Sequence, residues 1–194
     1  MTQDIILASN SPRRKYLLEL AEVPFEIVSI SIDESYPPDL NVQEIPLFIA
    51  KNKALAVKND LQNSYHRQYV DKAILAADTI VVLKDQIIGK PKNREEAIKM
   101  LTALSGCKHK VITGVVILQE GNEVSFVDVT EVEFNELTND QIVYYVDKYE
   151  PYDKAGAYAV QEWIGAIGIK SIRGDFYNVM GLPISRVLQA LRNL

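Results

Sequence analysis

The sequence predicts an α/β fold, because strand-like apolar runs alternate with segments of helical periodicity along the chain. An apolar run over residues 4–8 leads directly into a predicted helix that begins at Pro12, and a second strand follows over residues 25–32. At 194 residues, 47% of them hydrophobic and 24% charged, the chain is long enough for one sizeable core or two small lobes. No repeat, low-complexity segment or clear linker interrupts it, so we expect a single domain over residues 1–194.

A dense group of polar side chains follows the first strand. The turn and the start of the helix contain Ser9, Ser11, Arg13, Arg14 and Lys15. Ser11 is a good N-cap, and Pro12 suits the first helical position. Backbone N–H groups, hydroxyls, cationic side chains and the positive end of the helix dipole then meet near one point, which suits a phosphate. The alternative is an ordinary helix cap followed by a solvated basic turn.

Two adjacent acids, Asp33 and Glu34, follow the second strand. Acids in this position are often simply solvated, but beside a phosphate site carboxylates are the usual ligands of Mg²⁺. A capping box of Asn41 and Glu44 predicts a helix that runs to about Leu61. This helix carries several lysines, Lys53 among them, and spacing alone singles out none of them. A polar surface loop with an exposed His66 is expected over residues 59–72.

The most informative stretch is the apolar run over residues 74–83, which is interrupted by Asp78 and Thr79. An unpaired ionised carboxylate buried in such a run would cost roughly several kcal/mol. Asp78 must therefore have a compensating partner or face a polar cleft. The alternative is a strand that ends at Ala77, with Asp78 in a turn.

The remaining elements follow from turn and cap signals. We expect a hairpin that closes on Lys90 and Pro91, a helix over residues 93–106, antiparallel strands over 109–118 and 123–134, a helix capped by Thr138 and Gln141, an apolar stretch over 164–172, and a C-terminal helix opened by Pro183.

Composition excludes several classes of protein. The longest uncharged apolar stretches fall far short of the ~20 residues that a membrane-spanning helix needs, and no secretory signal is evident, so no membrane partner is expected. A single cysteine, Cys107, allows no intrachain disulfide and fits a cytoplasmic protein. The net charge of -5 argues against nucleic-acid binding, so an anionic ligand would need a local cluster of Lys and Arg.

Missing motifs narrow the chemistry further. The sequence has no phosphate-binding P-loop, dinucleotide fingerprint, H-E-x-x-H helix or C-x-x-C pair. Its two histidines, His66 and His109, are far apart in the sequence, which argues against a His-ligated zinc site, and neither is near a nucleophile-elbow motif. What is left is a set of carboxylates and a set of cations at strand ends and loops. Carboxylates and cationic side chains, together with a hard metal ion, are the groups that commonly promote attack of water on phosphorus.

The polar segments that interrupt the predicted apolar strands and helices follow one another in an order that resembles that of a known family. They are Ser9-Asn10-Ser11-Pro12-Arg13-Arg14, Asp33-Glu34, Lys53-Ala54, Ala77-Asp78-Thr79, Gly89-Lys90-Pro91, Ser105-Gly106, His109-Lys110-Val111-Ile112-Thr113-Gly114, Asp153-Lys154-Ala155-Gly156-Ala157-Tyr158, Gln161 and Asn178-Val179-Met180-Gly181-Leu182-Pro183. Together they resemble the Maf family of nucleoside triphosphate pyrophosphatases, over nearly the whole chain.

The resemblance implies a mixed α/β fold of the inosine triphosphate pyrophosphatase (Maf/HAM1) type, with an elongated twisted sheet, flanking helices and two lobes around a cleft. It also implies that water attacks the α-phosphate of a nucleoside triphosphate and releases pyrophosphate and the monophosphate, with Mg²⁺ or Mn²⁺ bound. A homodimer is expected on the same ground.

The same resemblance assigns roles to individual positions. Asp78 matches the proton acceptor, and Glu34 matches an acid that holds the metal together with Asp78. The phosphate-side positions are Ser9, Arg14, Lys53 and Lys90. At the three specificity positions, Arg13, Thr79 and Gln161 resemble the subgroup that acts on dTTP and UTP; the subgroup for 7-methylguanosine triphosphate tends to carry Trp, Gln and Glu there.

Two alternatives stay open. One is a Maf-family enzyme for other modified nucleotides, such as 7-methylguanosine triphosphate. The other is a nucleotide-binding regulator of cell division and septum formation without turnover, although the intact set of Asp78, Glu34 and Lys53 argues against it. A pure scaffold would leave the many polar breaks in apolar strands unexplained.

Overall fold

The structure of the protein, a computed structural model, describes residues 4–63 and 69–194. Its strands are β1 (Ile5–Leu7), β2 (Phe25–Ile27), β3 (Ala73–Leu83), β4 (Gln86–Ile88), β5 (Lys108–Gln119), β6 (Asn122–Phe134) and β7 (Ile169–Arg173). Its helices are α1 (Pro12–Leu20), α2 (Ile45–Asn63), α3 (Arg94–Leu104), α4 (Asn139–Tyr149), α5 (Trp163–Gly168), α6 (Phe176–Met180) and α7 (Ile184–Arg192), with short 3₁₀ turns η2 (Pro151–Asp153) and η3 (Ala155–Ala157).

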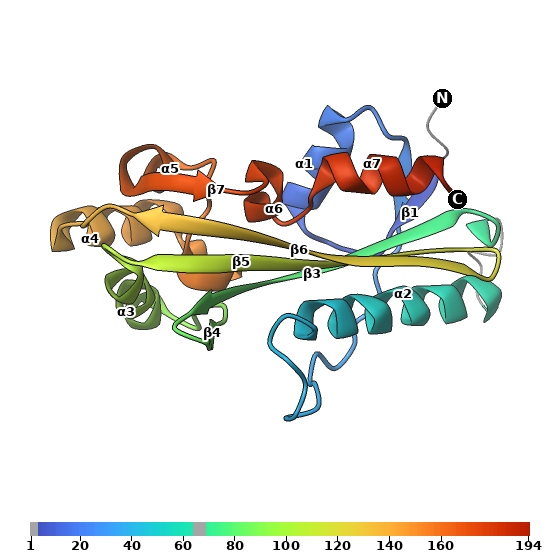
Figure 1. The fold of residues 1–194 in the computed structure, drawn as a ribbon, viewed down its shortest axis with the longest axis horizontal. Coiled ribbons are helices and arrows are strands. Elements are labelled where there is room, and N and C mark those ends of the chain that lie inside the picture. Colours follow the sequence, from blue (N-terminus) through green and yellow to red (C-terminus); the bar gives the residue numbers. More distant parts are fainter. Residues whose placement is uncertain (1–3, 64–68) are drawn as a thin grey trace. The chain divides into compact units, whose positions relative to one another are not determined.

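The seven strands form one mixed sheet in the order β2-β1-β3-β5-β6-β7, with β4 paired to β3 (Figure 1). β1 runs parallel to both β2 and β3, whereas β3 with β4 and β6 with β7 are antiparallel pairs. β5 and β6 are joined by two residues only, a connection that suits an antiparallel hairpin. The predicted mixed α/β fold with flanking helices is therefore confirmed.

The chain divides into two compact units. Unit 1 contains Met1–Asp78, Thr113–Asp128 and Gly181–Leu194, and unit 2 contains Thr79–Ile112 and Val129–Met180. Strands β3, β5 and β6 each contribute residues to both units. Each unit has its own apolar core: Ile6, Ala54 and Val116 are among the buried residues of the core of unit 1, and Leu101 and Phe134 among those of unit 2.

In unit 1, α2 covers one face of the sheet, while α1 and α7 cover the other (Figure 1). The contact between β5 and the start of α2 is very close at Gly114. A Cβ atom built there would lie 2.2 Å from the backbone nitrogen of Leu47, so only glycine fits this position. This close approach fixes where α2 begins relative to the strands.

In unit 2, α3 and α4 pack together, and each begins at a side-chain N-cap. The side chain of Asn93 accepts a hydrogen bond from the N–H of Glu96 at the start of α3. Thr138 and Gln141 form the complete capping box predicted for α4. A bidentate contact between Arg94 and Asp147 joins the two helices at their exposed sides.

Several boundaries differ from the sequence-based expectation. β2 ends at Ile27, so the second strand is shorter than residues 25–32. The Asn41 side chain accepts a hydrogen bond from the N–H of Gln43 and does not form the predicted capping box with Glu44. The helix α2 begins at Ile45. The first part of the predicted loop, residues 59–63, continues α2, and His66 lies outside the described residues. The short helix α6 was not expected.

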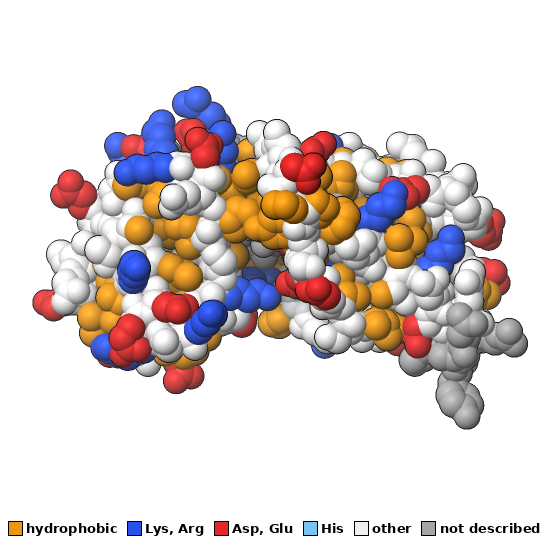
Figure 2. Space-filling view, turned by 90° about the horizontal axis from the view of Figure 1, so that it is seen from below, with side chains coloured by type: hydrophobic (Ala, Val, Ile, Leu, Met, Phe, Trp, Pro, Cys, Tyr) orange, Lys and Arg blue, Asp and Glu red, His pale blue; other side chains and the backbone are white. Residues whose placement is uncertain are grey.

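Acidic, basic and apolar side chains are mixed on the face drawn in Figure 2. In the part of the chain that the structure describes, no helix combines the length and the apolar character that crossing a bilayer requires.

Candidate active site

Three charged side chains of unit 1 meet at one atom. Lys53 Nζ lies 2.7 Å from Asp78 Oδ1 and 2.7 Å from Glu34 Oε1. Lys53 comes from the middle of α2, Asp78 from β3, and Glu34 from the loop that follows β2. The strand continues through Asp78 to Leu83, so the alternative in which Asp78 sits in a turn is wrong. The expected compensating partner of Asp78 is confirmed, and it is Lys53.

The turn after β1 contributes a second set of polar contacts to unit 1. Arg14 is only 8% exposed, and it donates from Nε to the carbonyl oxygen of Gly181 at 2.8 Å and from Nη1 to Ser9 Oγ at 3.1 Å. Ser11 occupies the N-cap position as expected, but its side chain makes no capping bond; its N–H donates to Ser9 Oγ at 3.2 Å instead. The turn is thus organised around Ser9 Oγ.

Electrostatics connect this turn with the ion-pair cluster. Burial of the guanidinium lowers the pKa of Arg14, the charge of Asp78 opposes that shift, and Arg13 and Glu34 act as further, smaller influences of opposite sign. Six of the predicted site residues are therefore collected in unit 1. They are Ser9, Arg13, Arg14, Glu34, Lys53 and Asp78.

The other three predicted residues, Thr79, Lys90 and Gln161, belong to unit 2. Thr79 is half-buried on β3, and Lys90 is exposed just after β4. The residue before it, Gly89, accepts a hydrogen bond from the N–H of Gly156 at 3.0 Å, which ties this segment to η3. Gln161 is exposed in a turn between η3 and α5.

A partly buried polar network in unit 2 was not predicted from the sequence. The Tyr145 hydroxyl donates to Glu162 Oε2 and accepts a hydrogen bond from the N–H of Ala159 at 3.2 Å. Glu162 Oε1 lies 3.5 Å from Nζ of Lys154, which donates to Asp153 Oδ1 at 2.7 Å. The crowding of charged and aromatic residues over 149–161 was the available signal, but nothing in the pattern of α4 marked Tyr145.

Three comparisons with known proteins bear on the identity of the chain. Residues 4–194 match the family model described as Maf-like protein. The chain belongs to the Maf family. It is 50% identical to the dTTP/UTP pyrophosphatase of Cytophaga hutchinsonii, over 98% of this chain and 84% of that protein. It is also 50% identical to the dTTP/UTP pyrophosphatase of Parabacteroides distasonis, over 97% of this chain and 95% of that protein.

A solved structure agrees with this family assignment at the level of the fold. The Ham1 protein of Staphylococcus aureus superimposes with a TM-score of 0.52 at 15% identity, covering 98% of this chain and 99% of that one. The expected Maf/HAM1 type of fold is confirmed by this likeness, which concerns the fold alone.

The carboxylates of this Maf-family chain suit a hard divalent cation. Oxygen atoms of Glu34 and Asp78 both face the Lys53 ammonium, so two anionic donors already converge on a positive charge. Among the described residues, no group of three or more His, Cys, Asp or Glu is placed to hold a metal ion. Two carboxylates, with the remaining positions taken by water and substrate phosphates, are the ligand set that Mg²⁺ commonly uses. The two carboxylates therefore fit a metal ion whose remaining ligands are water and phosphate oxygens.

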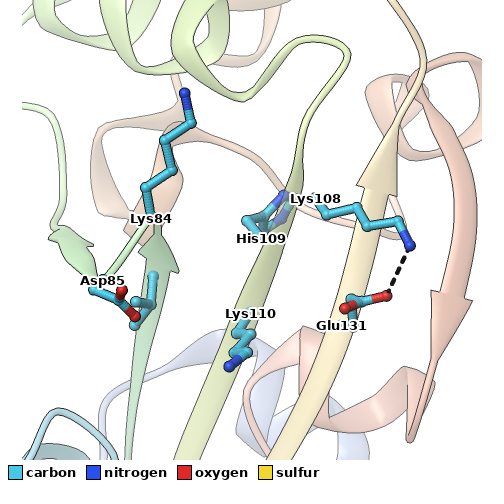
Figure 3. A pocket seen from close by; sticks show the side chains of 7 residues that line it. Lys84, Asp85, Lys108, His109, Lys110 and Glu131 are labelled. Atoms are coloured by element: carbon cyan, nitrogen blue, oxygen red, sulfur yellow. Dashed lines mark hydrogen bonds and ion pairs between the residues drawn. The ribbon is translucent and has the colours of Figure 1, made fainter.

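A separate pocket of about 170 Å³ lies in unit 2, and it contains none of the predicted site residues. It is lined by Val82, Lys84, Asp85, Lys108, His109, Lys110 and Glu131. In Figure 3 the Lys84 and Lys110 ammonium groups point away from each other, and Lys108 is paired with Glu131 at 3.4 Å. These cations do not converge on one point, so the pocket is no competitor of the cluster in unit 1 as a phosphate site.

Proposed function

We propose that this Maf-family protein is a nucleoside triphosphate pyrophosphatase that hydrolyses dTTP and UTP to the monophosphate and pyrophosphate. The observation that carries the proposal is the convergence of Asp78, Glu34 and Lys53 in unit 1, in the electrostatic neighbourhood of Arg13 and Arg14. Carboxylates for a metal and a proton, with cations for phosphate, are what hydrolysis of a phosphoanhydride needs. The printed names of the relatives support the choice of dTTP and UTP.

The contacts of Ser9 suit a phosphate-binding role. Its Oγ accepts hydrogen bonds from Arg14 Nη1 and from the N–H of Ser11, which occupies both lone pairs of the hydroxyl. Its own hydrogen is the remaining group with which the hydroxyl can make a hydrogen bond. The hydroxyl is therefore prepared to donate to an incoming oxygen, and a phosphate oxygen is such an acceptor. Arg14, held through Nε by Gly181, presents its charge from a fixed position.

Asp78 is proposed as the proton acceptor for the attacking water, and Lys53 as a cation that contacts the phosphates. Glu34 and Asp78 would hold Mg²⁺ or Mn²⁺. Such a cation, when bound, neutralises charge on the phosphates and lowers the pKa of water. Lys90 is proposed as a further phosphate contact.

Base selection is assigned to Arg13, Thr79 and Gln161. Thr79 offers one hydroxyl that can donate or accept, and Gln161 offers an amide with both a carbonyl and an NH₂ group. These groups suit the carbonyl and N–H pattern of thymine and uracil better than a charged side chain would. Exchange of Thr79 and Gln161 for Gln and Glu is expected to lower turnover of both nucleotides.

The test is pyrophosphate release by the purified protein with Mg²⁺ across dTTP, UTP, CTP, ATP, GTP and 7-methylguanosine triphosphate. We expect dTTP and UTP to be turned over, Asp78→Asn to be inactive, and Asp85→Asn, an exposed acid in the turn after β3, to retain activity. Preference for the methylated purine would overturn the roles of Arg13, Thr79 and Gln161. Absence of turnover with every nucleotide would overturn the proposed enzymatic function and favour a nucleotide-binding regulator.

We also propose a cytoplasmic homodimer in which both units fold as one domain. The single Cys107 fits a reducing compartment, and the dimer follows from the family resemblance. Light scattering of the protein as it elutes from a size-exclusion column should give twice the 21.8 kDa mass of one chain. A measured mass equal to that of one chain would contradict the dimer.

A further inference from the structure

Gln161 lies in a tight four-residue turn. The N–H of Glu162 donates to the carbonyl oxygen of Ala159 at 3.1 Å, so Val160 and Gln161 occupy the two central positions. Val160 is 7% exposed and packs inward, whereas Gln161 is exposed. In the described part of the chain, no other side chain bonds the Gln161 amide. The backbone of the turn therefore fixes the position and the Cα–Cβ direction from which this side chain extends.

One hydroxyl group holds both ends of this turn. Tyr145 accepts the hydrogen bond from the N–H of Ala159 at the first position and donates to the carboxylate of Glu162 at the last. The Tyr145 side chain is fully buried and stacks on Tyr149 with ring centroids 5.0 Å apart. It also belongs to α4, whose start is fixed by a complete capping box. The hydroxyl is thus a rigid reference point for the turn.

The Glu162 carboxylate is fixed from its other side as well. Its Oε1 atom lies 3.5 Å from Nζ of Lys154, whose side chain is only 10% exposed and donates to Asp153. Burial, and then the hydrogen bond to Glu162, raises the pKa of the Tyr145 phenol, so the phenol stays a donor. These contacts leave the turn little freedom to reorient.

We propose that Tyr145 is a positioning residue for base recognition: by holding the turn Ala159–Glu162 at both ends, it sets the direction from which Gln161 meets the base of the substrate. The inference rests on the proposed function, in which Gln161 contacts the base. Tyr145 itself is buried and touches no substrate. Its effect should appear in the affinity and selectivity for thymine and uracil nucleotides and not in the chemical step.

The test is Tyr145→Phe, which removes the hydroxyl oxygen and keeps the ring. We expect KM for dTTP and UTP to rise about tenfold, because a turn released at both ends must be ordered again when the base binds. The value of kcat should stay within about twofold. The ratio of kcat/KM for dTTP to that for CTP should fall, and this ratio does not depend on the fraction of protein that folds.

Tyr158→Phe is the matched control. Tyr158 is also buried in unit 2, but its hydroxyl bonds Nε2 of His109 at 2.7 Å and not the turn. This variant should lose stability without a change in the dTTP to CTP ratio. A drop in the ratio equal to that of Tyr145→Phe would show a general effect of destabilisation and overturn the proposal.

A double-mutant cycle separates the proposal from the proposed function. In a Gln161→Ala background, Tyr145→Phe should have little further effect on selectivity, because the side chain that it positions is gone. Independent, multiplicative effects would overturn the positioning role. If Gln161→Ala lowers selectivity and Tyr145→Phe does not, only the positioning role fails. If Gln161→Ala changes nothing, the role of Gln161 in the proposed function fails first.

Discussion

The ion pairs of Lys53 lead to a prediction about metal binding in the absence of nucleotide. A divalent cation that binds Glu34 and Asp78 must replace the Lys53 ammonium, which lies 2.7 Å from both carboxylates. Lys53→Met removes the charge and keeps an apolar stem of similar length. We therefore expect the variant to bind Mn²⁺ more tightly than the native protein, while pyrophosphate release falls because a proposed phosphate contact is lost.

The magnitude follows from the exposure of the three side chains. The pair with Asp78 joins side chains that are 17% and 14% exposed, and a charged hydrogen bond of this kind contributes about 1.5 kcal/mol. The Glu34 side chain is 51% exposed, so solvent screening limits its pair with Lys53 to about 0.5 kcal/mol. Relief from about 2 kcal/mol of competition corresponds to roughly 30-fold tighter Mn²⁺ binding.

Electron paramagnetic resonance of free Mn²⁺ during titration of the nucleotide-free protein measures this affinity directly. Lys51→Met is the matched control, because Lys51 is an exposed lysine of the same helix, paired with Glu123 at 3.1 Å. That variant should bind Mn²⁺ like the native protein. Adding Asp78→Asn to Lys53→Met should remove the gain. An unchanged or weaker Mn²⁺ affinity in Lys53→Met would refute the idea that Lys53 occupies the cation position.

Two further predictions concern stability. Burial lowers the pKa of His109 to about 4 from 6.5, so the unfolded chain takes up the proton first and stability should fall by about 3 kcal/mol as pH drops from 6.5 to 4. Urea unfolding at several pH values checks this, and His109→Phe should lose that part of the pH dependence. Gly114→Ala should lower the free energy of unfolding by about 3 kcal/mol, because the added Cβ would clash with the backbone of Leu47. Gly89→Ala is the control: open space surrounds this position, so the variant should have nearly the same melting temperature as the native protein.

Local patterns in the sequence were sufficient for several elements. The capping box at Thr138 formed as predicted, and Pro12 begins α1. The need of Asp78 for a partner followed from its apolar neighbours alone. These predictions succeed because caps, proline geometry and the cost of a buried charge depend on residues within a few positions of one another.

Other features depended on residues that are distant in the sequence. Lys53 and Lys51 lie on the same helix, and only the face of α2 that meets β3 decides that Lys53 reaches Asp78 while Lys51 pairs with Glu123. The sequence pattern of α4 likewise gives no sign of the hydrogen bonds by which Tyr145 connects this helix to the turn of Gln161.

The sequence by itself therefore determined the family, the α/β class and the set of candidate residues. The tertiary structure alone decided which lysine neutralises Asp78, that His109 is buried against Tyr158, and that β2 ends at Ile27. The physical reason is that helical and strand periodicity specify which residues share a face, whereas the partner of that face is set by packing between segments far apart along the chain.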